Sequence, residues 1–190
     1  MTETQIIYIN FVADINEKTA SLLLFLLTEQ LRSGVKNFRI NIASNGGTVF
    51  HAVSIYNFLS GLKGVEIHTH NLGRIDSAAN LIFLAGDKRT ASPISSFLLH
   101  SPQITIQAQA AAQFSIETLS EILESLQKDE GKMIEIIAKK LGKSQKDIKK
   151  MFNSRKTYSP TQAISYGWVT GTEEFVATPD TPIFTITNQA

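Results

Sequence analysis

Gly73-Arg74-Ile75-Asp76-Ser77-Ala78-Ala79-Asn80 and Ser96-Phe97-Leu98-Leu99-His100-Ser101-Pro102 are the two stretches that decide the reading of this chain. The first leads from a predicted strand into an apolar helix, with Ser77 at the junction. The second ends an apolar strand at His100 and continues into a proline. A serine hydroxyl becomes a good nucleophile only when a base takes its proton, and histidine is the usual base at neutral pH. Ser77 is therefore a candidate nucleophile and His100 its candidate general base. The ordinary structural explanation for a serine at this place is a helix N-cap, and Asp76 is an alternative cap.

A second strand-to-helix turn lies upstream, in Ala43-Ser44-Asn45-Gly46-Gly47-Thr48. A glycine pair can be simply a tight turn, but it also lets backbone N–H groups approach a ligand closely. The N–H groups of Gly47 and Ala78 are therefore candidate oxyanion donors, and Gly46 is a candidate substrate contact. Asn45 tolerates unusual backbone angles and so supports the turn.

Composition indicates an ordinary globular protein. The chain has 190 residues, of which 43% are hydrophobic and 18% charged, and its formal net charge is +1. This charge gives no reason to expect nucleic acid or an anionic membrane as a partner. The chain has no cysteine, which excludes disulfides and a cysteine nucleophile and is typical of a cytoplasmic protein. We expect one domain over residues 1–172 and a C-terminal surface tail over 173–190, with weak β character at Ile183 to Ile186.

The hydrophobic pattern alternates between strands and helices along the first half of the chain. Strands are predicted at 6–11, 38–42, 65–71, 88–91 and 96–99, and helices at 17–32, 49–62 and 77–84. This order predicts an α/β fold around a mainly parallel sheet. Farther on, 103–109 alternates as a strand would, and 115–141 has the period of one long helix that Gly142 ends.

With these motifs in place, the chain resembles the Clp protease proteolytic subunit (ClpP) family, serine peptidases of the ClpP/crotonase fold. The resemblance spans about residues 6–169. It rests on the glycine-pair turn, on Gly73 to Ser77, on Ala85-Gly86-Asp87-Lys88-Arg89, on Pro93 to Pro102, and on Ser159 to Gly167. It implies a ClpP/crotonase-like spiral of ββα units. It also implies a protruding handle, made of a strand and the long helix, that packs two subunit rings together.

The resemblance implies a serine endopeptidase that hydrolyses peptides or unfolded polypeptides without a metal or organic cofactor. It further implies a homo-oligomer of stacked hexameric or heptameric rings, with an AAA+ ATPase unfoldase as a candidate partner. Two alternatives remain. One is a weak or inactive ClpP-like subunit that acts beside an active partner, and the other is a crotonase-type acyl-CoA enzyme. The Ser77 and His100 pair argues against the second, because crotonases typically use carboxylates.

The third triad position departs from the family pattern. Arg155 stands where these enzymes usually carry an aspartate, and no Asp or Glu occurs between Asp147 and Glu173. Arginine cannot accept a hydrogen bond from the imidazole N–H. Asn153 can accept it if the loop shifts by two residues, and is the candidate third member. A backbone carbonyl or water are the other acceptors.

Overall fold

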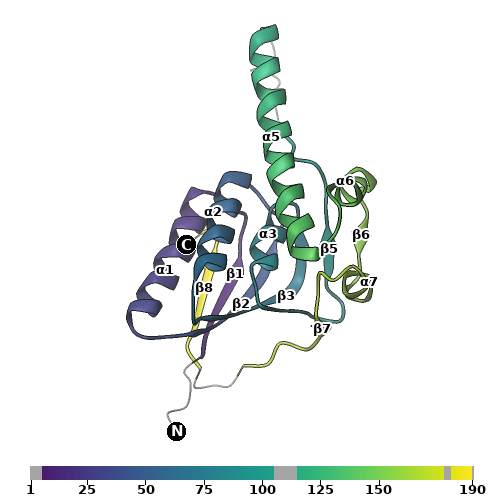
Figure 1. The fold of residues 1–190 in the computed structure, drawn as a ribbon. Helices are drawn as coiled ribbons and strands as arrows, with labels where there is room; N and C mark the ends of the chain where they lie inside the picture. The colour runs from purple at the N-terminus through teal and green to yellow at the C-terminus, as the bar shows by residue number, and fades with distance from the viewer. Residues whose placement is uncertain (1–5, 105–114, 178–180, 190) are drawn as a thin grey trace.

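The computed structural model describes residues 6–104, 115–177 and 181–189. Across these ranges one eight-stranded sheet runs through the molecule in the order β6-β5-β3-β2-β1-β8 (Figure 1). Strand β4 lies off this path and pairs with β3 and with β7. Its paired strands are parallel except for β5 with β6. The strands are β1 Ile6–Val12, β2 Asn37–Ser44, β3 Glu66–Asp76, β4 Lys88–Ala91, β5 Ser96–Leu98, β6 Thr157–Tyr158, β7 Gly171–Thr172 and β8 Ile183–Thr187. The prediction of an α/β fold with a mainly parallel sheet is confirmed.

Strand β3 is longer than predicted because it has two successive partners. Its first half pairs with β4 over His68 to Asn71, and its second half pairs with β5 over Arg74 to Asp76. The second pairing places Asp76 opposite Leu98. Ser77 therefore follows the end of one strand, and His100 follows the end of its neighbour by two residues. Parallel pairing thus brings the two predicted catalytic residues to the same edge of the sheet.

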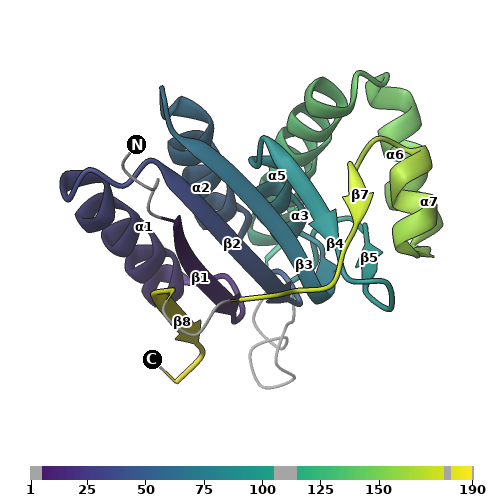
Figure 2. The ribbon, with the colours of Figure 1, turned by 90° about the horizontal axis from the view of Figure 1, so that it is seen from below.

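Helices cover one face of this sheet, as Figure 2 shows for α1, α2, α3 and α5. The helices of the described ranges are α1 Glu17–Arg32, α2 Val49–Gly61, α3 Ala79–Leu84, α5 Ile116–Leu141, α6 Gln145–Ser154 and α7 Pro160–Ser165. Side chains of Asn16, Ser115, Ser144 and Ser159 accept hydrogen bonds at the starts of α1, α5, α6 and α7. Such caps satisfy N–H groups that have no partner inside the helix.

The long helix α5 has two different halves. Its C-terminal half packs on the body, where Met133 and Ile137 are fully buried. Its N-terminal half extends away from the body (Figure 1) and exposes Ile116, Leu119 and Leu123. The companion strand expected at 103–109 lies mostly outside the described residues. None of the helices in the described ranges combines the length and apolarity needed to cross a membrane.

The C-terminal residues contribute to the sheet. Residues 173–190 were expected to form a surface tail with weak β character at Ile183 to Ile186. Ile183–Thr187 instead form a strand of the sheet, β8, which pairs in parallel with β1 at its edge. Residues 173–177 cross the face of the sheet opposite the helices, where the ring of Phe175 contacts Tyr8 edge-on and His70 at a tilt. A short β-branched run becomes a strand here because an unpaired sheet edge offers it a ladder of hydrogen bonds.

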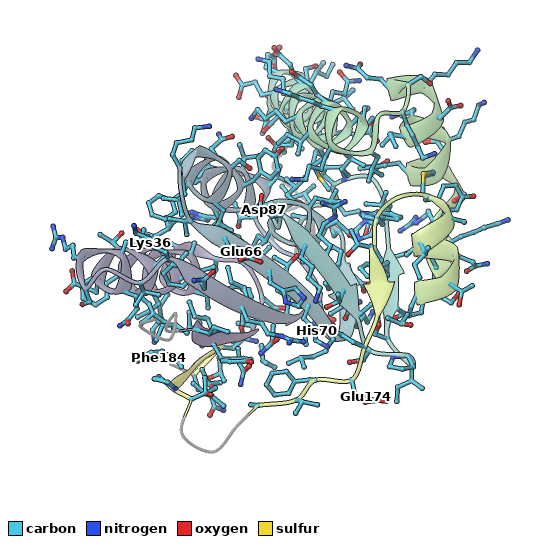
Figure 3. All side chains as sticks on the ribbon, turned by 60° about the horizontal axis from the view of Figure 1, so that its bottom comes forward. Lys36, Glu66, His70, Asp87, Glu174 and Phe184 are labelled. Carbon is cyan, nitrogen blue, oxygen red and sulfur yellow. The ribbon has the colours of Figure 1, made fainter. Side chains whose placement is uncertain are left out.

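A buried polar network lies under this crossing segment, and Figure 3 shows His70 on that side of the sheet. His68 Nε2 and His70 Nδ1 lie 2.7 and 2.8 Å from the hydroxyl of Thr90, which in turn lies 3.1 Å from a carboxylate oxygen of Glu173. Since Thr90 donates to Glu173, both imidazoles donate to Thr90. In a neutral His70 whose Nδ1 donates, Nε2 accepts from the hydroxyl of Ser92, 3.1 Å away. Glu173 also binds Arg39 and Lys88. The network therefore fits two neutral histidines.

Candidate active site

Ser77 lies in a strained turn between β3 and α3. Its φ is 52°, in the left-handed region that residues other than glycine seldom adopt. Its N–H donates to the carbonyl of Leu98 on β5, and its carbonyl accepts from the side chain of Asn80. The first helical residue is Ala79, and the N-cap is Ala78. Ser77 is therefore not a helix cap, which was the ordinary structural explanation for a serine at this place.

The glycine-pair turn is packed directly against the serine turn. A Cβ added to Gly46 would lie 2.7 Å from Cβ of Ser77 and 2.8 Å from the carbonyl oxygen of Asp76. The other side of the turn is held by Ile15, which hydrogen-bonds to Gly46 and Thr48. Within the described residues, the N–H groups of Gly47 and Ala78 donate to no protein acceptor. Two unengaged backbone donors therefore flank the Ser77 turn, as an oxyanion site requires.

His100 is oriented by the backbone. Its Nδ1 lies 2.8 Å from the carbonyl oxygen of Ser101. A carbonyl only accepts, so Nδ1 carries the proton and Nε2 keeps a free lone pair. This is the tautomer that a general base needs. Within the described part of the chain, no hydrogen bond yet joins His100 to Ser77; such contacts often tighten only when substrate binds.

Ser77, His100 and Gly47 line one cleft of about 290 Å³. Asn45, Thr48 and Val49 extend it from the glycine turn, Pro102 and Gln103 from the segment after β5, and Leu126 and Asp129 from α5. The structure therefore brings together the predicted nucleophile, base and first oxyanion donor. It adds a wall from α5, which the sequence reading had assigned only to subunit packing.

Asp76 is a site residue that sequence reasoning passed over as an alternative helix cap. It is 3% exposed, and one carboxylate oxygen pairs with Arg74 Nε. The other, Oδ1, has no hydrogen-bond partner among the described residues. Burial raises the pKa of Asp76, while the charges of Arg74 and of His100 act in the opposite direction. The sequence signal that could have identified Asp76 is its position directly before the predicted nucleophile Ser77.

Asn153, the candidate third member of the triad, is not brought to His100. It is exposed near the C-terminal end of α6 and is absent from the residues that line the cleft. Arg155 is exposed as well, at the left-handed C-cap of α6, where its φ is 49°. Of the acceptors considered from sequence, the backbone carbonyl is the one that Nδ1 of His100 contacts. The reason is local: the chain turns at Ser101-Pro102 and places this carbonyl beside the imidazole.

Comparison with known proteins identifies the family. The sequence profile of the Clp protease family matches residues 1–173. Among solved structures, a mutant of ClpP1 from Listeria monocytogenes is similar to this chain with a TM-score of 0.75 and 21% sequence identity. The match covers 88% of this chain and 91% of that chain. At this identity the structural match supports the fold alone, whereas the profile match spans nearly the whole sequence. The chain therefore belongs to the Clp protease family.

Proposed function

We propose that this protein is a serine endopeptidase that cleaves peptides or unfolded polypeptides. The observation that carries the proposal is the shared cleft. There Ser77, held in a left-handed turn, faces the same space as a histidine whose free lone pair is on Nε2. Membership of the Clp protease family favours this activity over the crotonase-type alternative.

In the proposed reaction, Ser77 Oγ attacks the scissile carbonyl carbon while Nε2 of His100 takes the hydroxyl proton. The N–H groups of Gly47 and Ala78 hold the resulting oxyanion. The C–N bond breaks when His100 returns the proton to the leaving amine, which leaves an acyl-serine. Water then attacks the ester with His100 again as base, and the acid product leaves with Ser77 restored.

The rival is a weak or inactive subunit that works beside an active partner. It is favoured by one specific observation: the imidazole is supported by a neutral carbonyl, which stabilises the imidazolium less than a carboxylate does. We therefore expect slow hydrolysis of small peptides.

An active-site reagent separates the two functions. A fluorophosphonate should label the wild-type protein at serine, and labelling should disappear in Ser77→Ala and fall strongly in His100→Ala. Ser165→Ala, an exposed serine on α7, is the matched control and should label like the wild type. Equal labelling of wild type and Ser77→Ala would reject the nucleophile. Absence of labelling in the wild type would favour the inactive subunit.

The proposed assembly is a homo-oligomer of stacked hexameric or heptameric rings, with an AAA+ ATPase as the candidate supplier of unfolded substrate. Its support is the projecting half of α5, where Ile116 is 80%, Leu123 56% and Leu119 48% exposed. Apolar side chains in a row on one helix favour burial against another subunit. Light scattering should give a mass of six or more subunits, and Leu123→Glu should reduce it. A wild-type monomer at micromolar concentration would contradict the assembly.

A further inference from the structure

The cleft beside Ser77 has an uneven distribution of charge. Leu126 and Asp129 lie three residues apart on α5 and therefore on one face of the helix, the face that continues to the buried Met133. Asp129 is the one acidic residue that lines the cleft within the described chain, and no lysine or arginine lines it. A carboxylate thus stands on an otherwise apolar stripe of the helix, in the cleft that Ser77 also lines.

The remaining wall suits the stem of a long side chain. Leu126, Val49 and Pro102 contribute apolar surface, and Asn45, Thr48 and Gln103 are polar but uncharged. A lysine or arginine side chain combines an aliphatic stem with a cationic head. The stem would pack against the apolar residues, and the head would reach the carboxylate of Asp129.

Asp129 is free to exchange its present partner. It pairs with Lys132 at 2.9 Å on the same helix, and the two side chains are 27% and 52% exposed. Exposed pairs on one helix contribute little to stability, so a substrate cation can replace Lys132. The neighbouring Glu130 is engaged differently, because it binds both Lys149 and the hydroxyl of Ser101. Asp129 is therefore the carboxylate that α5 presents to a substrate.

We propose that Asp129 makes the enzyme selective for substrates with lysine or arginine at the residue whose carbonyl Ser77 attacks. This inference rests on the proposed peptidase function and adds its substrate class. A charge-assisted hydrogen bond at the cleft wall should favour a lysine substrate over an uncharged one of the same shape by about tenfold in kcat/KM.

Two fluorogenic peptides that differ only in lysine or norleucine at that position provide the test. The wild type should prefer lysine about tenfold, Asp129→Asn should lose the preference, and Lys132→Met should increase it because Asp129 loses its competing partner. Glu124→Gln is the matched control, since it removes from the same helix an exposed carboxylate that pairs with Lys128 and does not line the cleft. It should keep the preference. Equal rates for both peptides in the wild type, or an unchanged preference in Asp129→Asn, would overturn the inference.

A binding measurement keeps this test independent of turnover. In the Ser77→Ala background, fluorescence polarisation should show tighter binding of the lysine peptide, and adding Asp129→Asn should abolish the difference. If fluorophosphonate labels Ser77 but neither assay distinguishes the peptides, the specificity inference fails and the peptidase function stands. If labelling is absent while the binding difference depends on Asp129, the catalytic proposal fails and the cation subsite stands.

Discussion

Acidification from pH 7 to pH 5 should destabilise this protein through the two buried histidines under the C-terminal segment. His70 is fully buried, and His68 has a side chain only 13% exposed. Burial, with the charges of Arg39 and Lys88, lowers the pKa of both His68 and His70 from 6.5 to about 4, although Glu173 acts in the opposite direction. Between these values the unfolded chain binds protons that the folded protein does not. Stability is therefore full above pH 6.5 and falls as the pH decreases toward 4.

The expected loss follows from these pKa values. At pH 5 the unfolded imidazole is almost fully protonated and the native one mostly neutral, which costs about 2 kcal/mol for each histidine, or about 4 kcal/mol for both. This is a large share of the roughly 5–15 kcal/mol that stabilises a typical domain. The hydrogen bonds support this direction, because Thr90 and Ser92 already satisfy both nitrogens of a neutral His70.

Urea unfolding at pH 7 and pH 5 measures this loss, with the fluorescence of the buried Trp168, the only tryptophan, as the signal. Protein concentration is kept constant because association also stabilises. His70→Asn should lose about half of the pH effect, whatever its stability at pH 7. His51→Asn, at the start of α2 and outside the network, is the control and should keep the whole effect. An equal unfolding free energy at both pH values in the wild type would refute the reasoning, as would an unchanged pH effect in His70→Asn.

Three further outcomes are expected at the active site. Gly47→Ala should lower the free energy of unfolding in urea by roughly 2–4 kcal/mol and abolish fluorophosphonate labelling, because the added Cβ would lie 2.2 Å from the carbonyl oxygen of Ile15. Gly61→Ala is the control and should do neither, since a Cβ added there has no atom within 4 Å. Asp76→Asn should stabilise the protein at neutral pH, because the raised pKa of Asp76 makes its buried ionised form costly, and it should slow peptide hydrolysis. The stabilisation should shrink as the pH falls. A loss of stability at pH 7 would show that the ion pair with Arg74 dominates instead. Asn153→Ala should label at the wild-type rate, and a tenfold decrease would return Asn153 to the site.

Much of the fold was predictable because its signals are local. The capping side chains of Asn16, Ser144 and Ser159 mark helix starts through hydrogen bonds within three residues, and Gly142 ends α5 in a left-handed conformation. The alternation of strands and helices then favours parallel pairing between the strands. The order of the serine turn, the histidine and the glycine turn also follows from the chain alone.

The tertiary structure decided what depends on neighbours distant in sequence. It placed Asp129 in the cleft, because α5 packs beside Ser77 and His100, and the period of a helix in the sequence does not show which element the helix packs against. It assigned the acceptor of His100 to the carbonyl of Ser101 and left Asn153 outside, since the position of α6 depends on packing. It turned residues 183–187 into an edge strand, because β1 offered them a partner. Sequence determined the residue types and their local conformations, whereas the burial and charge around each side chain came only from segments that folding brings together.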